Sequence, residues 1–521
     1  MKFDISKMLH ADVYDHPVKA IELIETHISW VVLTGDYAYK IKKSVNFGFL
    51  DFSTLAKRQH YCKQEVKLNS RLTTNVYIDI VSISKKHNKL LISNTDVIEY
   101  AIKMRQFPQS AQLDNMLAAG QLNVSHVDAI SKLVAEFHQS AQVADETSPF
   151  GDPEAVYRPV AENFNQIKQQ LNTKVYDDIL TELNLWSDST FNHLKTVFTQ
   201  RKRQGFIREC HGDMHLRNLV WLGDRTKLEI DKGPMAFDCI EFNESLRWID
   251  VISEVAFLVM DLQDRKQFQL ANRFINSYLE RTGDYAGLSI LPFYLCYRAM
   301  VRAKVAILRL QQEGLSEEDK IQLFKEFETY LELAKDYSHP PKVKLIIMRG
   351  VSASGKSTVS QLLVDNLGAI RLRSDVERKR LDDADKSQRV PNKINTGLYS
   401  ENISEKTYAK LLLLASQTIE AGFNVIVDAA FLKYEQRKDF QILAKSLGIE
   451  FIIVELTAPV ETLKQRIIAR KNDVSDADLE VLEFQLKNWE PLHKEEKLNT
   501  ISANNLKPEE IIKLIDSLAF S

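Results

Sequence analysis

The run from Gly350 to Ser357, GVSASGKS, constrains the fold of this chain more than any other feature. It fits the G-x-x-x-x-G-K-S/T pattern and stands between an apolar run, KLIIM, and a helical pattern, KSTVSQLLVDNL. A strand, turn and helix of this kind cradles phosphate, because glycines let backbone N–H groups turn inward and the helix N-terminus adds positive dipole. Lys356 would neutralise the β- and γ-phosphates of a nucleotide, and the Ser357 hydroxyl would ligate Mg²⁺. The expected nucleotide-binding residues are Gly350, Val351, Ser352, Ala353, Ser354, Gly355, Lys356, Ser357 and Thr358.

Two acids in the same part of the chain follow apolar runs. Asp428 ends the run VIVD, where it can hold the hydration shell of Mg²⁺; the alternative is an acid that caps a turn. Asp375, in LRSDVERKR, is expected at the carboxyl edge of another strand, which faces the ligand crevice of an open α/β sheet. Asp375 is therefore placed to accept a proton from a substrate hydroxyl, with Arg378 close by for an anionic group. Helix N-capping is the alternative for Asp375.

A basic helix follows these strands. The run ETLKQRIIARKNDVSDADLEVL, 461–482, puts Arg466 and Arg470 four residues apart on one helical face. We expect both arginines to bind nucleotide from a lid that closes over the transferred phosphoryl group, and a solvated basic face is the alternative. Further along, SDAD opens another helix, with Ser475 as its expected N-cap.

The combination resembles the small P-loop kinases of the shikimate, gluconate, zeta-toxin and polynucleotide 5′-kinase type over about 345–515. The resemblance rests on GVSASGKS, the RSD-x-x-R segment, VIVDAAF and R-x-x-x-R followed by SDA. It implies that Asp375 is the substrate base and that Lys356 takes part in catalysis. The loop motif is shared by all P-loop NTPases, so kinase is favoured over ATPase by the short fold, the lid arginines and the lack of an evident AAA+ helical bundle.

A second constellation lies in the first half of the chain. In HGDMHLRN, 211–218, Asp213 is followed five positions later by Asn218, which fits a kinase-type catalytic loop of base and then metal ligand. Downstream, MAFDCIEF ends an apolar stretch on Asp238, the position of an acid that chelates Mg²⁺ on nucleotide phosphates. Asp213 is thus the expected catalytic base, and Asn218 and Asp238 are the expected metal ligands.

A lysine and a glutamate upstream complete this constellation. Lys40 stands on an expected strand, AYKIKK, and Glu65 on an amphipathic segment, 52–72. Their ion pair would position the α- and β-phosphates, so both are expected nucleotide-binding residues. Lys42 is a rival for Lys40, because a two-residue spacing puts both on one face of a strand. The alternative to an active site here is a pseudokinase, but the base and both metal ligands are retained.

This half, about 25–310, resembles the aminoglycoside phosphotransferase family, whose relatives include choline, homoserine and fructosamine kinases. HGDMHLRN matches the family signature H-G-D-x-H-x-x-N at every defined position. The resemblance implies that Asp213 is the base, that Asn218 and Asp238 bind Mg²⁺, and that Lys40 contacts phosphate. It further implies that His211 and His215 hold the loop in shape. The small lobe has no G-x-G-x-x-G, and the family often lacks one.

The patterning predicts two fold classes in one chain. An α+β bilobal protein-kinase-like domain is expected over 1–338, with a strand-rich small lobe at about 25–107 and a helical large lobe at about 108–338. Two prolines in SHPPK end the helical stretch 317–337, so a linker is expected at 339–342. An α/β P-loop NTPase domain with a parallel sheet is expected over 343–521, where strands and helices alternate.

The composition of the chain limits the kinds of partner and compartment that we expect for it. The 521 residues carry 68 Lys and Arg against 71 Asp and Glu, a formal net charge of −3, which argues against a dedicated nucleic-acid coat. The four cysteines are too few and scattered for a disulfide framework, the N-terminus is not a signal peptide, and no apolar run reaches a membrane span, so we expect a cytoplasmic protein. A local basic cleft keeps a nucleic-acid partner as an alternative: Arg371, Arg373, Arg378, Lys379 and Arg380.

The expected function is transfer of the γ-phosphoryl group of ATP to a hydroxyl of a small-molecule acceptor, with ATP and Mg²⁺ as cofactors and two nucleotide sites. One alternative is a nucleotide-regulated ATPase switch, in which the P-loop half gates the other half or a partner. Another is a nucleic-acid 5′-end kinase formed by the C-terminal domain. The sequence identifies neither the acceptor nor the oligomeric state, because one fold hosts many acceptors.

Overall fold

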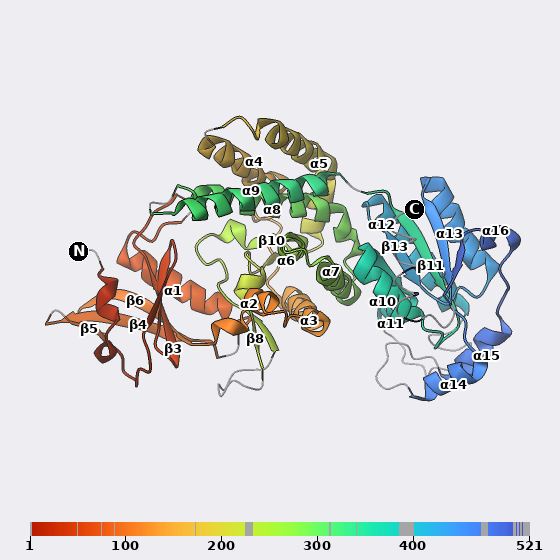
Figure 1. Cartoon of the computed structure of the whole chain (residues 1–521), viewed down its shortest axis with the longest axis horizontal. Helices are drawn as coiled ribbons and strands as arrows, with labels where there is room; N and C mark the ends of the chain where they lie inside the picture. The colour runs from red at the N-terminus through yellow and green to blue at the C-terminus, as the bar shows by residue number, and fades with distance from the viewer. Residues whose placement is uncertain are drawn as a thin grey trace. The chain divides into compact units, whose positions relative to one another are not determined.

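The computed structural model describes residues 3–48, 50–73, 75–87, 89–171, 173–223, 233–311, 314–339, 341–384, 401–469 and 478–503, together with Lys507, Glu510 and Lys513. The chain divides into two compact units. Unit 1 comprises Met1–Asp261 and Tyr297–Glu328, and unit 2 comprises Leu262–Cys296 and Thr329–Ser521. Figure 1 gives the order of the helices and strands along the chain. Within the described residues, no helix has both the length and the apolar character that a membrane crossing requires.

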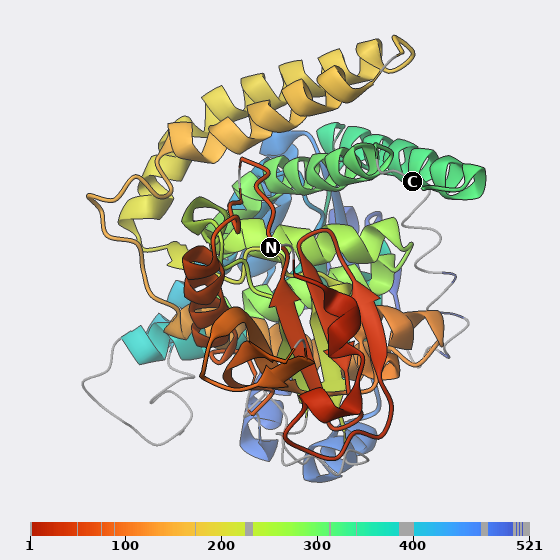
Figure 2. The ribbon, with the colours of Figure 1, turned by 90° about the vertical axis from the view of Figure 1, so that its left-hand side faces the viewer.

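The small lobe of unit 1 is a six-stranded antiparallel sheet in the order β1-β2-β3-β6-β4-β5, whose strands are drawn in red and orange in Figure 2. Alternating apolar residues such as Val32, Tyr39 and Ile83 face its core. Helix α1 packs against β4 and β6, so one face of the sheet is covered. The bounds are β1 (Glu22–Glu25), β2 (Ser29–Leu33), β3 (Tyr37–Lys42), α1 (Leu55–Asn69), β4 (Tyr77–Lys86), β5 (Lys89–Ile92) and β6 (Val97–Arg105).

The large lobe is mainly helical, and short strand pairs position its loops. Strands β8 and β9 pair antiparallel, as do β7 and β10. Helices α6, α8 and α9 each run across the boundary between the two compact units. The helices are α2 (Leu113–Ala118), α3 (Val124–Ser140), α4 (Pro153–Gln170), α5 (Asp177–Arg203), α6 (Val251–Asp264), α8 (Leu291–Arg309) and α9 (Glu317–Ser338). The strands and short turns are β7 (Ile207–Glu209), η4 (Leu216–Asn218), β8 (Leu219–Leu222), β9 (Gly233–Ala236), η5 (Glu244–Leu246) and β10 (Trp248–Asp250).

Unit 2 is built on a five-stranded parallel sheet in the order β12-β13-β11-β14-β15. The three inner strands of the sheet carry apolar runs, as expected where helices cover both faces of a sheet. The strands are β11 (Lys344–Arg349), β12 (Ile370–Arg373), β13 (Val425–Asp428), β14 (Glu450–Glu455) and β15 (Thr500–Ser502). The helices are α7 (Phe268–Thr282), η6 (Tyr285–Ile290), α10 (Lys356–Leu367), α11 (Ser374–Ala384), α12 (Glu401–Glu420), α13 (Tyr434–Leu447), α14 (Val460–Ala469), α15 (Leu479–Lys487) and α16 (Lys494–Lys497).

Both predicted fold classes are confirmed: a bilobal α+β arrangement precedes an α/β part with a parallel sheet. Within this agreement, the apolar run 30–41 is a hairpin of β2 and β3, because Gly35, with a positive φ of 101°, lies in the turn between them. In the predicted helical run 461–482, the described helices are α14 and α15, and Arg470 and Ser475 lie outside the described residues. The side chain of Asp478 caps α15.

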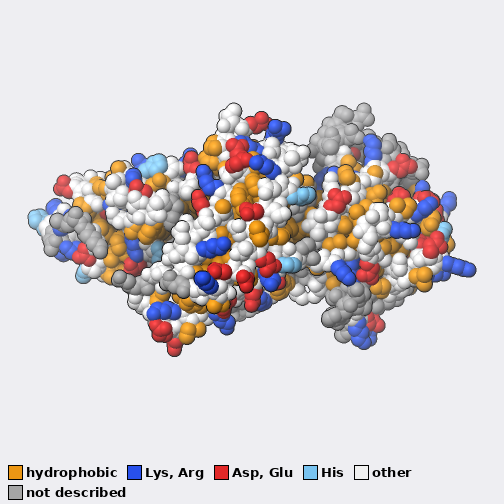
Figure 3. Space-filling view, turned by 90° about the horizontal axis from the view of Figure 1, so that it is seen from above, with side chains coloured by type: hydrophobic (Ala, Val, Ile, Leu, Met, Phe, Trp, Pro, Cys, Tyr) orange, Lys and Arg blue, Asp and Glu red, His pale blue; other side chains and the backbone are white. Residues whose placement is uncertain are grey.

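The compact units do not follow the predicted division at 339–342, because residues 262–296 pack with the P-loop part. As a division of the sequence, the linker stays a prediction; α9 ends at Ser338 and β11 begins at Lys344 around it. On the face shown in Figure 3, acidic, basic and hydrophobic side chains are interspersed, in keeping with the near balance of charge.

Candidate nucleotide sites

In unit 1, two lysines of strand β3 meet one glutamate of helix α1. Lys40 Nζ lies 2.7 Å from Glu65 Oε1, and Lys42 Nζ lies 2.6 Å from Glu65 Oε2. The period of two residues along a strand brings both ammonium groups to the same side. Burial alone would raise the pKa of Glu65, but the two lysines hold that pKa well below its usual range, so Glu65 is an anion. The predicted Lys40–Glu65 pair is therefore present, and Lys42 shares it.

The remaining contacts distinguish the two lysines. Lys40 also pairs with Asp238 and lines an open cavity. Lys42 is 1% exposed, pairs with Glu241, and lies 4.7 Å from the centre of the Phe52 ring. Lys40 is thus the lysine that a bound phosphate can reach, whereas Lys42 fixes Glu65 and Glu241 from behind. Glu241 is thus a buried partner of Lys42.

The loop from His211 to Asn218 brings the expected base and metal ligand together. Asn218 Nδ2 donates to Asp213 Oδ2 at 3.0 Å and to the Asp213 carbonyl oxygen at 2.9 Å. His215 Nε2 lies 3.5 Å from Asp213 Oδ2. Burial works against ionisation of Asp213, but His215 and His211 hold the pKa of Asp213 below its usual range. Asp213 is therefore an anion that can accept a proton.

Two buried acids of helix α6 hold this loop from behind. Glu254 accepts hydrogen bonds from the His211 backbone N–H at 2.8 and 2.9 Å and from that of Gly212 at 3.0 Å. Asp261 accepts from the Leu216 N–H at 2.9 Å. Both acids interrupt the apolar run 251–262. An acid inside a buried helix needs hydrogen-bond donors around it. The two acids were therefore a signal for a supported loop, and sequence reasoning missed it.

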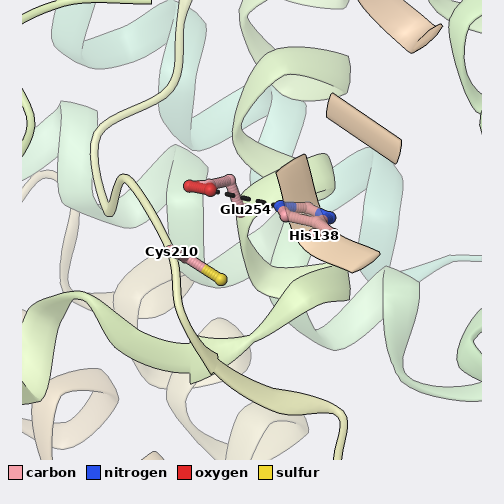
Figure 4. A group of neighbouring side chains, drawn as sticks. All are labelled: His138, Cys210 and Glu254. Atoms are coloured by element: carbon pink, nitrogen blue, oxygen red, sulfur yellow. Dashed lines mark hydrogen bonds and ion pairs between the residues drawn. The ribbon is translucent and has the colours of Figure 1, made fainter. Parts of the chain in front are cut away.

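Glu254 also belongs to a buried group with His138 and Cys210, which Figure 4 shows side by side. His138 Nε2 lies 3.2 Å from Glu254 Oε1, and burial raises the pKa of the Cys210 thiol well above its usual range. A metal would need a thiolate here and would displace the loop N–H groups from Glu254. The group is therefore better explained as support for the catalytic loop.

Asp238 follows β9 and faces Lys40. Its φ of +64° is unusual for a residue other than glycine, and its N–H donates to Tyr77 Oη at 3.2 Å. The preceding N–H, of Phe237, donates to the Asn218 carbonyl oxygen at 3.0 Å, which ties the Asp238 segment to the loop that carries Asn218. Strained backbone of this kind persists where the surroundings over-determine it, which is common at functional sites. A carboxylate and an amide oxygen are ligands that suit Mg²⁺.

These groups border a cavity of about 470 Å³ within unit 1. Its lining combines apolar side chains with polar and charged ones, which suits a nucleotide with a flat base and a charged phosphate chain. Phe107 and Phe237, which both line the cavity, meet edge-on with 5.2 Å between ring centres. The apolar lining includes Ile24, Val31, Leu33, Ala38, Val76 and Phe107, and the polar lining includes Lys40, Tyr77, Asn218 and Asp238.

In unit 2, the loop from Gly350 to Ser357 has the backbone that phosphate binding requires. Ala353 and Gly355 have φ of +64° and +102°, and Gly355 precedes the first residue of α10. A Cβ on Gly350 would lie 2.5 Å from Ser354 Oγ and 2.6 Å from the Leu456 carbonyl oxygen, so only glycine fits there. Lys356 Nζ donates to the Val351 carbonyl oxygen at 2.9 Å and thus folds back over the loop. Val351, Ser352, Ser357 and Thr358 lie on the same turn and the start of α10.

The two acids predicted for this site lie at the carboxyl edge of the sheet. In the strand register, Asp428 on β13 is opposite both Met348 on β11 and Arg373 on β12. Asp428 Oδ2 lies 3.0 Å from Ser360 Oγ, one turn beyond Ser357 on α10. Asp375 is the second residue of α11, directly after β12, and Arg378 Nη1 lies 3.2 Å from its Oδ1.

Two side chains from helices α14 and α15 contact the phosphate loop, one that the sequence predicted for this site and one that it did not. Arg466 on α14 donates to the Ala353 carbonyl oxygen at 3.1 Å and so contacts the phosphate loop; its role as a nucleotide-binding lid residue stays a prediction. Gln485 on α15 accepts from the Ser352 N–H at 2.6 Å. Sequence reasoning missed Gln485, because a glutamine on an amphipathic helix carries no distinguishing pattern. Arg470 lies outside the described residues.

The basic cluster considered for nucleic acid is mostly paired within unit 2. Glu280 on α7 pairs with Arg371 at 2.7 Å and with Arg373 at 3.5 Å, and Arg380 pairs with Glu377. With Arg378 on Asp375, four of the five basic residues have acidic partners. These acids offset part of the positive charge of the cluster, and a nucleic-acid partner stays an alternative.

Comparison with known proteins gives matches to the C-terminal part and to the whole chain. A family model described as an AAA domain matches residues 345–492. An uncharacterized protein of Mycobacterium tuberculosis is 30% identical over 485 residues, which cover 92% of this chain and 93% of the relative. A sugar kinase structure from Janibacter sp. is 22% identical with a TM-score of 0.27, over 34% of this chain and 94% of the other. A choline kinase structure from Cryptosporidium parvum is 13% identical with a TM-score of 0.39, over 61% of this chain and 89% of the other.

Proposed function

The chain belongs to the same family as the mycobacterial protein that it matches over nearly its whole length, and we propose that it is an ATP- and Mg²⁺-dependent phosphotransferase with two nucleotide sites. The observation that carries the proposal is that Lys40, Asn218 and Asp238 line one cavity of unit 1. Glu65 is paired with Lys40, and Asp213 is hydrogen-bonded to Asn218. A cation, two metal-type ligands and an ionised base are the parts that phosphoryl transfer uses.

In the first site, the residues divide the work of an in-line transfer. Lys40, oriented by Glu65, would hold the α- and β-phosphates, while the apolar wall takes the base. Asn218 and Asp238 would hold Mg²⁺, which neutralises charge on the phosphates. As the acceptor oxygen bonds to the γ-phosphorus and the bond to ADP breaks, Asp213 takes the hydroxyl proton. His215 favours the anionic form of Asp213 before the transfer.

In the second site, the phosphate loop and Lys356 would hold the nucleotide phosphates, and Ser357 with Asp428 would hold Mg²⁺. Asp375, at the same edge of the sheet as Asp428, would accept the proton of a second hydroxyl acceptor. Arg466 already contacts the loop backbone and would turn to the transferred phosphoryl group. The acceptor in both sites is proposed to be a small molecule with a hydroxyl group.

The test is incubation of the full-length protein with γ-labelled ATP and a fractionated metabolite and RNA extract. Asp213→Ala should abolish label transfer by the first site, and Lys356→Ala should abolish transfer and nucleotide binding by the second. Asp36→Ala and Lys494→Ala, at exposed positions, are the matched controls and should transfer label like the unaltered protein. Unchanged ATP consumption in the double variant would refute the proposal.

The same experiment separates the alternatives. Steady ATP hydrolysis with no labelled acceptor in any fraction would favour a nucleotide-regulated switch. Label on RNA ends, with binding that weakens steeply as salt rises, would favour a nucleic-acid 5′-end kinase.

A further inference from the structure

Helix α7 lies between α6 and α8 in the sequence, yet it packs in unit 2 against α10, the helix that follows the phosphate loop, and against β12 (Figure 1). The contacts are specific hydrogen bonds. Gln269 Nε2 donates to Asn366 Oδ1 at 2.9 Å, and Asn272 Nδ2 donates to the Asp365 carbonyl oxygen at 3.1 Å. Helix α7 is therefore an integral part of the P-loop unit, although it stands far upstream of the P-loop.

A buried asparagine fixes the register of α7 on the sheet. Strand β12 is at one end of the strand order, so its outer backbone groups need partners other than a strand. Asn276 supplies them: its Oδ1 accepts from the Arg371 N–H at 2.7 Å, and its Nδ2 donates to the Ala369 carbonyl oxygen at 2.9 Å. The Asn276 side chain thus takes the place of a neighbouring strand, and it is 3% exposed.

One turn further along α7, Glu280 forms a hydrogen-bonded ion pair with the side chain of Arg371. Glu280 Oε1 accepts from Arg371 Nε at 2.8 Å and from Nη2 at 2.7 Å. The third nitrogen of the guanidinium, Nη1, lies 3.3 Å from Ser360 Oγ and 3.5 Å from the Ser357 carbonyl oxygen. Arg371 is 6% exposed, so its charge is held in a water-poor place between α7 and α10.

The contacts of Arg371 lead to the expected metal ligands of the second site. Because Ser360 Oγ accepts from Arg371, its own proton is free to donate to Asp428 Oδ2, 3.0 Å away. The same guanidinium touches the backbone of Ser357. Arg371 thus contacts the backbone of Ser357 directly and the Asp428 carboxylate through Ser360, and these two residues carry the oxygen ligands expected for Mg²⁺.

We propose that Glu280 is a positioning residue for the Mg²⁺ of the second nucleotide site, acting through Arg371; this inference rests on the function proposed for that site. Glu280 neutralises Arg371 and aims its Nη1 at α10. Without Glu280, the guanidinium loses its paired carboxylate, and its Nη1 still faces Ser360, which bonds to Asp428. It would turn toward Asp428 and compete with the metal for that carboxylate.

The test measures how strongly Mg²⁺ tightens nucleotide binding, which is a readout independent of turnover. The full chain carries Lys40→Met, so that a fluorescent ATP analogue reports on the second site, and Kd is measured in saturating Mg²⁺ and in EDTA. Partners that orient metal ligands change metal affinity by about 10- to 100-fold, so Glu280→Gln should lower the Mg²⁺ enhancement roughly tenfold. Its Kd in EDTA should be unchanged, and Glu280→Asp should recover part of the enhancement.

Gln269→Ala and Asn272→Ala are the matched controls, because they remove α7 contacts that do not lead to Arg371. Arg371→Lys, which keeps the charge but loses the two-pronged contact, should behave like Glu280→Gln, and it replaces that variant if the latter does not fold. An enhancement in Glu280→Gln equal to that in the controls would overturn the inference. Equal weakening in Mg²⁺ and in EDTA would also overturn it, since that result indicates a collapsed loop.

Failure of the proposed function gives a different result. In that case the Lys40→Met parent itself shows no Mg²⁺-dependent binding that Lys356→Ala abolishes, and both the second site and the role of Glu280 fall together. Where the parent binds in this way and only Glu280→Gln fails to differ, the second site stands and the inference alone falls.

Discussion

Replacing Glu254 by glutamine tests whether a buried carboxylate holds the catalytic loop of unit 1. Glu254 is 1% exposed and accepts from two backbone N–H groups and from His138. Burial alone would raise the pKa of Glu254, but His138 and His211 lower it from 4.5 to about 2. At about 1.4 kcal/mol for each unit of pKa, this difference corresponds to about 3 kcal/mol of stability that depends on the charge.

Glutamine keeps the shape of the side chain but turns an amide NH₂ toward backbone N–H donors. We therefore expect Glu254→Gln to lower the free energy of unfolding by about 3 kcal/mol, in line with about 1.5–3 kcal/mol for each hydrogen bond to a charged group. For a unit of about 290 residues, the melting temperature should fall by roughly 5 °C. The assay is thermal and urea unfolding of the full chain, followed by near-UV circular dichroism.

The lowered pKa of Glu254 also fixes how the stability of the fold changes with pH. A carboxyl whose pKa is lower in the folded state stabilises the fold above its unfolded pKa of 4.5, and this stabilisation is lost as the pH falls toward 2. The unaltered protein should lose stability over this window more steeply than Glu254→Gln. Glu244→Gln, at an exposed acid paired with Arg247, is the control and should change stability by less than about 1 kcal/mol. If Glu254→Gln unfolds like the control, the carboxylate does not hold the loop.

Three further substitutions test other parts of the structure. Lys42→Met should destabilise the chain by about 3–5 kcal/mol in urea unfolding, because it leaves buried acids without their cation, whereas a phosphate-contacting lysine would chiefly affect nucleotide Kd. Gly350→Ala should abolish nucleotide binding by the second site in isothermal titration, since its Cβ has no room; binding at the unaltered Kd would contradict the geometry. Asn276→Ala should cost about 1–3 kcal/mol, because the Arg371 N–H and the Ala369 carbonyl oxygen lose their partner, and hydrogen exchange should rise at Arg371 and not at Val427 on the neighbouring strand β13.

The phosphate loop and the HGD loop could be predicted from sequence because each packs its chemistry into a short run. Gly350 to Ser357 and His211 to Asn218 carry their spacing with them, and the strands around them have clear patterns. The pairing of Lys40 with Glu65 could be anticipated as well, since one stands on a strand and the other on the next helix. These features depend on short stretches of sequence, so they can be predicted from those stretches alone.

The parts that sequence reasoning missed depend on contacts between distant segments. Glu254 and Asp261 were visible as acids in an apolar run, but their donors lie about 40 residues upstream. Helix α7 has the pattern of any amphipathic helix, and only the fold shows that Glu280 meets an arginine 91 residues later. The choice between Lys40 and Lys42 required their partners, Asp238 and Glu241, which are three residues apart.

The asparagine that covers β12 bears on how such a chain can be divided or inherited. A cut at the prolines near residue 340 would yield a fragment with a complete phosphate loop and all five parallel strands, but with the outer edge of β12 bare. Bare strand edges recruit other strands, so that fragment would be prone to aggregate. The two halves therefore cannot be exchanged independently of each other. A lineage that lost the first half would have to replace helix α7 before it could keep the second.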